Sequence, residues 1–368
     1  MFKAEELFQN ITDRNHPDET VLTIIQGKGT LPREQAGRNI HYDNASLSNY
    51  KKVEQGDFII HLRSFEGGLE MANEAGIVSP AYTILRCKRP HSSLFYDAYF
   101  HTDEFINHNL SKSVEGIRDG RQISYEAFKW LGIPYCEPTE QEKISTLFSA
   151  FNERIAKQRD LVESLKKYKR GVNNQILSQF DNSYNCRLGS VCEIVGGGTP
   201  DTLHAEYWGN TVEWFTPSEI GKTKYVNNSV RKLSDIGLDN SSAKLLPIGT
   251  VLLTTRATLG EMSIAKRECS TNQGFQSLIP HTDRVSSEYL YYMQIIIKPW
   301  CEKYASGNTF REISKSALSD CIIPIPDRAR QEQIVKLLSS IDMIIDAAES
   351  ISMSLSKIRH GLMQQLFI

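Results

Sequence analysis

Residues 133–148 read IPYCEPTEQEKISTLF, and residues 323–338 read IPIPDRARQEQIVKLL. The two stretches align without a gap at a separation of 190 residues, and the alignment continues to the C-terminal segment. Further upstream the separation becomes 193, where GDFIIHLRSFEG (56–67) aligns with GTVLLTTRATLG (249–260). The chain is therefore a duplication of one unit, and each unit ends in a similar segment.

Both terminal segments have the periodicity of a long amphipathic helix. Each begins after a proline-bearing loop and contains no internal proline, so each can run for about 40 residues, or about 60 Å. Steps of three and four residues give two predicted seams, Ile144, Phe148, Phe151, Ile155, Gln158, Val162, Leu165, Lys169, Val172 and Ile176, and Ile334, Leu338, Ile341, Ile345, Ala348, Ser352, Leu355, Arg359, Leu362 and Leu366. An ordinary bundle helix is the alternative, but two seams of equal length and phase favour mutual pairing.

The order of the segments along the chain predicts the direction of this pairing. The first helix carries the chain from the first domain to the second, and the second helix leaves the second domain in the same way. Two similar units related by a two-fold axis therefore pair their helices antiparallel. We predict domains at residues 1–132 and 181–322, with helical segments at 133–180 and 323–368. The globular domains are expected to be β-rich, because KVEQGDFIIHL and KLLPIGTVLLTT place a glycine turn before a β-branched run.

Composition and motifs restrict the class of protein. The chain has 368 residues, of which 40% are hydrophobic, and no apolar stretch reaches the roughly 18 residues of a membrane span. Its start also lacks the apolar core of a signal peptide, so we expect a soluble cytoplasmic protein with no membrane partner. The formal net charge of −2 means that nucleic-acid binding would have to use local basic patches.

The sequence contains no recognisable catalytic or metal-binding motif. Seven cysteines without a C-x-x-C pair predict reduced thiols and argue against disulfides or zinc. VGGGTP (195–200) lacks the strand and helix context of a dinucleotide loop, and IGKT (220–223) lacks the first glycine of a P-loop. No His-Glu-x-x-His or Gly-x-Ser-x-Gly motif is present. We therefore expect no enzyme activity and no cofactor in this chain.

The second half carries a set of motifs that resembles a known family. These motifs are GGTP (197–200), YWGNTVEWFTPSEI (207–220), LLPIGTVLLTTRATLG (245–260), TNQGF (271–275) and SGNTFREIS (306–314), followed by a long helix ending near KIRHGLMQQLF (357–367). Together they resemble the specificity subunit of type I restriction-modification systems. The first half departs from the pattern, with SPAY (79–82) at the position of TNQGF and GIRDGRQIS (116–124) at that of SGNTFREIS.

The resemblance implies a fold and a set of partners. The implied fold is α+β, with two α/β target-recognition domains joined by two long antiparallel coiled-coil helices in a pseudo-two-fold arrangement. Each domain would read one half of a split site in double-stranded DNA, and the helices would act as spacer and as dock for two methylation subunits. S-adenosylmethionine, ATP and Mg would then be used by the methylation and restriction subunits of the complex. A two-headed coiled-coil scaffold or adaptor without a DNA partner is the alternative.

Comparison of the two repeat units divides the candidate site residues into two classes. Residues shared by both units suit common tasks such as phosphate contact or partner docking, whereas differing polar loops suit base reading, because Arg, Lys, Gln and Asn match base edges. For each loop residue, solvated surface is the competing interpretation, and for the arginines Arg63 and Arg256 it is a structural bond to loop carbonyls. The DNA-binding candidates are Gln26, Lys28, Arg33, Arg38, Arg63, Lys222, Lys224, Asn227, Asn228 and Arg256. The partner-binding candidates are Gln141, Glu142, Gly171, Gln175, Gln331, Glu332, Gly361 and Gln365.

Overall fold

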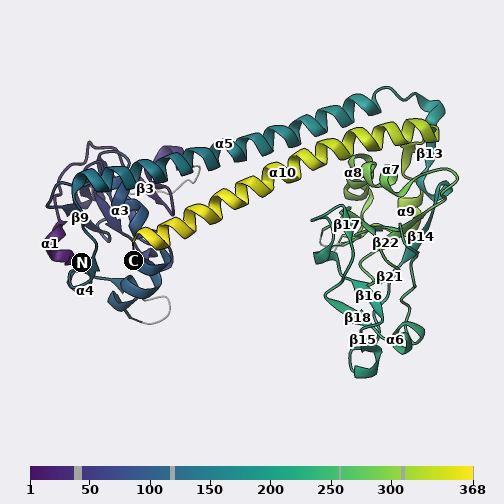
Figure 1. Cartoon of the computed structure of the whole chain (residues 1–368), viewed down its shortest axis with the longest axis horizontal. Helices are drawn as coiled ribbons and strands as arrows, with labels where there is room; N and C mark the ends of the chain where they lie inside the picture. Colours follow the sequence, from purple (N-terminus) through teal and green to yellow (C-terminus); the bar gives the residue numbers. More distant parts are fainter. Residues whose placement is uncertain (37–43, 117–120, 257, 308–310, 368) are drawn as a thin grey trace. The chain divides into compact units, whose positions relative to one another are not determined.

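The computed structural model describes residues 1–36, 44–116, 121–256, 258–307 and 311–367. The chain divides into two compact units: unit 1 is Met1–Leu161 with Ala348–Ile368, and unit 2 is Val162–Ala347. Each unit contains a sheet-bearing body and a part of each of two long helices, α5 (Pro138–Leu177) and α10 (Arg328–Leu366) (Figure 1). The predicted pair of long helices is therefore confirmed.

The starts of the two helices follow from their first residues. Proline stands at the first position of α5, where its missing N–H is no loss and its fixed φ suits the helix. Asp327 precedes α10, and its Oδ1 accepts a hydrogen bond from the backbone N–H of Arg330 at 2.8 Å. This aspartate caps one of the backbone donors that a helix start leaves unpaired.

The helices pair antiparallel within each unit. In unit 1, the rings of Phe148 and Phe367 lie 6.1 Å apart, and Gln158 Nε2 donates to the Ala348 carbonyl at 3.0 Å. In unit 2, Lys169 Nζ lies 2.5 Å from Asp342 Oδ1. The predicted seam residues are buried or half-buried along both helices, with one exception.

The exception lies in the last turn of α10. Leu366 is 43% exposed, whereas Phe367 is buried and packs against the rings of Phe95 and Tyr99. Met363 is also buried in this cluster. The seam therefore shifts by one residue at its end, because the aromatic side chain of Phe367 fills the apolar core of unit 1.

The main sheets of the two units share the order of four strands, and the sheet of unit 2 has β17 in addition. In unit 1 the order is β2-β9-β6-β7, formed by β2 (Phe8–Ile11), β9 (Thr83–Cys87), β6 (Phe58–Ile60) and β7 (Glu70–Met71). In unit 2 it is β14-β22-β19-β20-β17, formed by β14 (Cys192–Gly196), β22 (Gln276–Pro280), β19 (Val251–Leu253), β20 (Met262–Ala265) and β17 (Tyr225–Val226). Thus β9 and β22, and β6 and β19, have bounds that differ by the separation of 193 found in the sequence.

The register of pairing repeats as well. Phe58 pairs with Met71 in unit 1, and Val251 pairs with Ile264 in unit 2. The first and last strands of each body also pair in both units. These pairs are β1 (Phe2–Lys3) with β12 (Gly132–Ile133), and β13 (Asn185–Arg187) with β23 (Ile322–Pro324). The duplication therefore extends to the register of these central strand pairs.

The remaining elements surround these sheets. Unit 1 adds the pairs β3 (Leu22–Ile25) with β4 (Gly29–Pro32), β5 (Lys51–Val53) with β8 (Gly76–Val78), and β10 (Val114–Glu115) with β11 (Gln122–Ile123). Its helices are α1 (Ala4–Leu7), α2 (Ser64–Gly67), α3 (Ser93–Phe100) and α4 (Tyr125–Phe128), with short turns η1 (Arg33–Ala36), η2 (Asn44–Asn49), η3 (Glu104–Asn109) and η4 (Leu110–Ser113).

Unit 2 contains a second sheet in the order β15-β18-β16-β21. It consists of β15 (Trp208–Gly209), β18 (Arg231–Leu233), β16 (Val212–Phe215) and β21 (Cys269–Thr271). The other elements of this unit are α6 (Asp235–Asp239), α7 (Ser287–Tyr292), α8 (Gln294–Tyr304) and α9 (Lys315–Ser319), with short turns η6 (Asn182–Tyr184), η7 (Leu188–Ser190), η8 (Ala205–Tyr207) and η9 (Pro217–Glu219). In the described part of the chain, no helix has the length and apolar character needed to span a membrane.

Candidate nucleic-acid interface

A tight turn in unit 1 carries two of the DNA-binding candidates. Gln26, Gly27, Lys28 and Gly29, named here the Lys28 turn, connect β3 to β4, and the side chains of Gln26 and Lys28 are exposed. Gly27 and Gly29 have φ values of 73° and 77°, which glycine adopts without steric cost. The local sequence therefore forces the chain to reverse here and to present Lys28 at the tip.

A buried carboxylate holds the Lys28 turn. Glu70 Oε1 accepts from the Gly27 N–H at 2.6 Å, and Oε2 accepts from the Gly29 N–H at 2.8 Å. His101 Nε2 lies 3.4 Å from Oε1 of Glu70. Burial alone would raise the pKa of Glu70, but the hydrogen bonds from His101 and from the two glycines outweigh it and hold the pKa below its usual value. The carboxylate is therefore charged while it orders the turn.

A cavity lies beside the Lys28 turn. Its volume is about 690 Å³, and it brings together Gln26 and Arg63, which are 37 residues apart in the sequence. His61, Leu62 and Tyr82 also line it. Arg63 is exposed at the start of α2, so unit 1 joins two of the predicted DNA-binding residues at one hollow surface.

Arg33 is not among the residues that line this cavity. Arg33 begins η1, where it is half-buried, and its backbone N–H donates to the Val21 carbonyl at 3.0 Å. Arg38 lies outside the described residues.

Unit 2 presents the remaining candidate lysine and asparagines on exposed loops. Lys222, Asn227 and Asn228 are all exposed. The asparagine loop is anchored at Ser229, whose N–H and Oγ donate to Glu213 Oε2 at 2.7 and 2.9 Å. Burial alone would raise the pKa of Glu213, but its contacts with Lys232 and Ser229 lower it below its usual value. Both asparagines therefore project from an ordered loop.

Two predicted DNA-binding residues of unit 2 already have partners inside the unit. Lys224 Nζ donates to Tyr292 Oη at 3.1 Å and to Ser339 Oγ at 3.3 Å, and burial lowers its pKa. Arg256 Nε donates to Glu312 Oε2 at 2.9 Å. These contacts engage both cations within the fold, and the partner of Arg256 is a carboxylate and not the loop carbonyls considered as its alternative.

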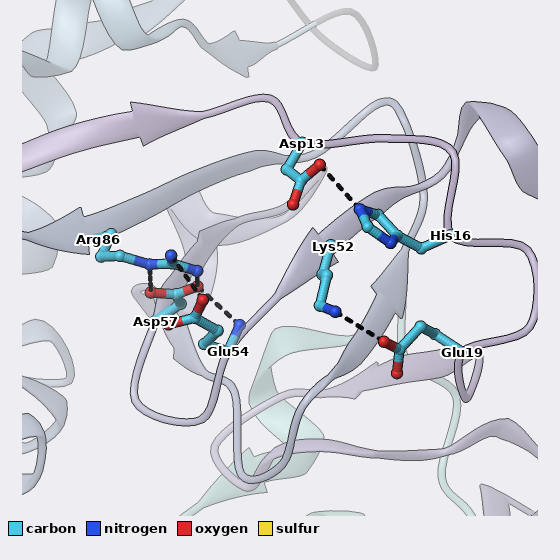
Figure 2. A network of polar contacts seen from close by, with 7 residues as sticks. All are labelled: Asp13, His16, Glu19, Lys52, Glu54, Asp57 and Arg86. Atoms are coloured by element: carbon cyan, nitrogen blue, oxygen red, sulfur yellow. Dashed lines mark hydrogen bonds and ion pairs between the residues drawn. The ribbon is translucent and has the colours of Figure 1, made fainter.

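Several charged residues of unit 1 form ion pairs with one another. Figure 2 shows Arg86 between Asp57 and Glu54, with distances of 2.8 Å from its terminal nitrogens to each carboxylate. In the same view Lys52 pairs with Glu19 at 2.7 Å, and His16 with Asp13 at 2.9 Å. In this network each basic side chain is paired with a carboxylate. These residues therefore offer little free positive charge to a nucleic acid.

The partner-binding candidates fall into two groups. Gln141 and Gln331 are fully buried at the starts of α5 and α10. Gln141 accepts from the Ser92 N–H and donates to the Cys136 carbonyl, and Gln331 makes the same contacts with Ser286 and Pro326. The structure thus gives these two glutamines a role inside their own units, joining helix to sheet body. The exposed group comprises Glu142, Gly171, Gln175, Glu332, Gly361 and Gln365.

Exposed apolar residues on the long helices were missed by the sequence reasoning. Three pairs of large exposed side chains occupy equivalent positions of the repeat: Leu147 and Leu337, Leu161 and Ile351, and Tyr168 and Ile358. They lie outside the predicted seam, at multiples of seven residues along each helix. The signal that could have found them is an apolar residue repeated at the same non-seam position of both helices. Such a face is typical of helices that bind further helices.

The described residues contain no candidate metal-ion site and no disulfide. All seven cysteines are free, and no group of three or more His, Cys, Asp or Glu side chains in the described part of the chain is arranged to hold a metal ion. Burial raises the pKa of Cys192, Cys269, Cys301 and Cys321 to about 12, so these thiols are poor nucleophiles.

Comparison with known proteins finds similar sequences. Residues 180–355 match the family described as "Type I restriction modification DNA specificity domain". This part of the chain is therefore similar to a type I DNA specificity domain, and the relatives that match the chain are type I specificity subunits. The chain is 34% identical over 186 residues to the Type I restriction enzyme MjaIX specificity subunit of Methanocaldococcus jannaschii, covering 50% of this chain and 43% of that protein. It is 24% identical over 259 residues to the EcoR124I/EcoR124II specificity subunit of Escherichia coli, covering 66% of this chain and 63% of that protein.

Two solved structures share the fold. A chain from a study of complex assembly and conformational transition of the type I R-M system matches with a TM-score of 0.63 at 20% identity, covering 100% of this chain and 96% of that chain. The HsdS subunit from Thermoanaerobacter tengcongensis matches with a TM-score of 0.52 at 19% identity, covering 100% and 95%. The sequence matches, in contrast, span less than two thirds of the length of the two curated relatives.

Proposed function

We propose that this chain is the DNA-recognition subunit of a type I restriction-modification complex. In this proposal each unit reads one half of a split site in double-stranded DNA, and the chain itself performs no catalysis. The match of residues 180–355 to a type I DNA specificity domain supports the proposal, and the single observation that carries it is the pair of sheet bodies with a shared strand order but different polar loops. Two readers with a common scaffold and different loops are suited to two different half-sites.

The proposed partners are two methylation subunits, with restriction subunits in the larger assembly. S-adenosylmethionine would be the cofactor of the methylation subunits, and ATP and Mg would serve the restriction subunits. The exposed apolar positions on α5 and α10 support docking, because equivalent residues on both helices would bind two copies of one partner. Gly171 and Gly361 occur on the same helices, exposed and with open space where a Cβ would stand, which permits close approach of another helix.

A mobility-shift experiment tests this function against the scaffold alternative, which the similarity to type I specificity subunits does not favour. Random-sequence duplex is titrated with the full chain, alone and with co-purified methylation subunits, over a series of salt concentrations. We expect weak binding by the chain alone, since its net charge is −2, and tight, salt-sensitive binding by the assembly. Absence of duplex binding by both preparations at low salt would support a protein scaffold instead.

A further inference from the structure

The structure reveals a match between two loops that differ in the sequence alignment. The Lys28 turn precedes β4, and in unit 2 the residues Ile220, Gly221, Lys222 and Thr223, named here the Lys222 turn, precede β17. Gly221 has a φ of 86°, comparable with 73° at Gly27. A glycine in the left-handed region followed by an exposed lysine is therefore present in both units.

Equivalent strand positions hold the two turns. Glu70 pairs with Ile59 across β7 and β6, and Ser263 pairs with Leu252 across β20 and β19. These pairs have the separation of 193 that relates the two units. Both Glu70 and Ser263 are fully buried. The same site of the fold therefore carries a polar side chain in each unit.

The anchoring contacts flank the lysine in both turns. Glu70 accepts hydrogen bonds from Gly27 and Gly29, the residues before and after Lys28. Ser263 Oγ accepts from the Gly221 N–H at 3.2 Å and donates to the Thr223 carbonyl at 2.7 Å, on either side of Lys222. A carboxylate and a hydroxyl thus fix the backbone at both neighbours of the exposed lysine.

The two lysines differ from the engaged cations nearby. Among the described residues, neither Lys28 nor Lys222 has a hydrogen-bond or ion-pair partner for its ammonium group. Lys224 and Arg256, in contrast, are bonded within unit 2. An ordered turn with a free ammonium at its tip is suited to binding an anion from outside the molecule.

The neighbours of the lysines indicate which anion. Gln26 is replaced by Ile220 in the second turn, and Gly29 by Thr223, while the lysine is kept. A cation common to two readers cannot distinguish their half-sites, whereas phosphate oxygens are common to every duplex sequence. Lysine also lacks the fixed fork with which arginine reads a base edge, and it binds phosphate as a point charge.

We propose that Lys28 and Lys222 each bind a backbone phosphate of DNA, and that Glu70 and Ser263 are the positioning residues of these contacts. The proposal rests on the proposed DNA-recognition function. It changes the sequence-based assignment of the two lysines from base reading to phosphate binding. The exposed Gln26 is then left to read bases in unit 1, whereas its counterpart Ile220 is buried in the core of unit 2 and leaves that task to other residues.

The salt dependence of binding tests the phosphate contacts. The full chain is titrated with fluorescent random-sequence duplex from low salt upward, and the slope of log K against log salt is measured. Each of Lys28→Gln and Lys222→Gln should reduce the magnitude of the slope by about 0.9, because one phosphate contact releases about that many counterions. The exposed Lys112 and Lys315 provide matched controls, and Lys112→Gln and Lys315→Gln should leave the slope unchanged.

Double variants test the positioning residues. In a Glu70→Gln background, Lys28→Gln should change the slope much less than it does in the parent chain, while Lys222→Gln should keep its full effect. In a Ser263→Ala background the opposite is expected: Lys222→Gln should change the slope much less than it does in the parent chain, while Lys28→Gln should keep its full effect. A purely structural role for Glu70 or Ser263 would lower the melting temperature without this selective coupling. The surface lysine variants test the main proposal even where a buried variant folds poorly.

The outcomes separate this proposal from the function on which it rests. A parent chain that binds no duplex even at low salt contradicts the proposed function. A parent chain that binds duplex, with lysine variants of unchanged slope, overturns the phosphate contacts alone. If Lys28→Gln instead alters the preference among duplex sequences with an unchanged slope, the lysine reads bases and the proposal is wrong.

Discussion

Arg86 is the cation that pairs with the buried carboxylate of Asp57 in unit 1. Asp57 has a side chain only 4% exposed, and both of its carboxylate oxygens accept hydrogen bonds from Arg86, at 2.9 and 2.8 Å. Arg86→Met would leave this carboxylate buried without its cation. We expect a loss of about 3 kcal/mol in the free energy of unfolding of unit 1, because an unpaired buried charge is costly. Amide hydrogen exchange of β9 under native conditions measures this loss.

Lys52 supplies the matched control for Arg86. It pairs with Glu19 in the same network, but the two side chains are 28% and 37% exposed (Figure 2). Lys52→Met should therefore cost much less stability than Arg86→Met, because an exposed ion pair contributes little. Equal losses in the two variants would mean that burial of Asp57 does not set the strength of the Arg86 pair.

Lys222 and Lys224 show what a sequence can say about single residues. They are two residues apart, and the sequence assigned both to DNA. Lys222 is exposed, whereas Lys224 contacts Tyr292 and Ser339, which are 68 and 115 residues further along the chain. Partners so far along the chain cannot be inferred from the residues around a lysine. Residue type and loop position therefore predict candidate DNA-binding residues, but they do not predict which lysines lack a partner within the fold.

At the scale of elements, regular patterns were predicted and exceptions were not. The long helices follow from uninterrupted heptad-like spacing, and the central strands follow from glycine turns before β-branched runs. The second sheet of unit 2, from β15 to β21, was not predicted, because its strands are short and β16 pairs with β21 parallel across a long sequence separation. The buried roles of Gln141 and Gln331 were missed for the same reason, since their partners Ser92 and Ser286 are 49 and 45 residues away.

The exposed helical glycines give a prediction about docking. Gly171 and Gly361 lie within α5 and α10, and an added Cβ would meet nothing within 4 Å. Gly171→Ala and Gly361→Ala should each stabilise the helix by about 1 kcal/mol, because glycine is a poor helix former. The same variants should weaken co-purification of a methylation subunit, because the added methyl group prevents close approach of its helix. Thermal unfolding and quantitative pull-down measure the two effects.

Ser164 and Ser354 provide the control for the glycines. They are exposed, equivalent in the repeat and located on the same two helices. Ser164→Ala and Ser354→Ala should improve the helices slightly and leave co-purification unchanged, since no Cβ is added. Undiminished capture by the glycine variants would exclude close helix packing at these positions.

At the scale of the whole molecule, duplication of one unit is the property from which function follows. The two units share strand order and register, as well as a glycine-lysine turn held from one strand position. They differ in the polar residues around these turns and in the second sheet of unit 2. A shared scaffold with separate loops predicts that each unit recognises its own half-site independently of the other.

Sequencing of methylated positions in a genome that carries the whole operon tests this central claim most directly. The measurement is made with the parent chain and with a chain in which residues 1–132 are replaced by the equivalent domain of a relative. We predict methylation at a split sequence, and in the exchanged chain a change in one half-site while the other half-site and the gap stay the same. Simultaneous change of both half-sites, or methylation at an uninterrupted sequence, would contradict the account of two independent readers.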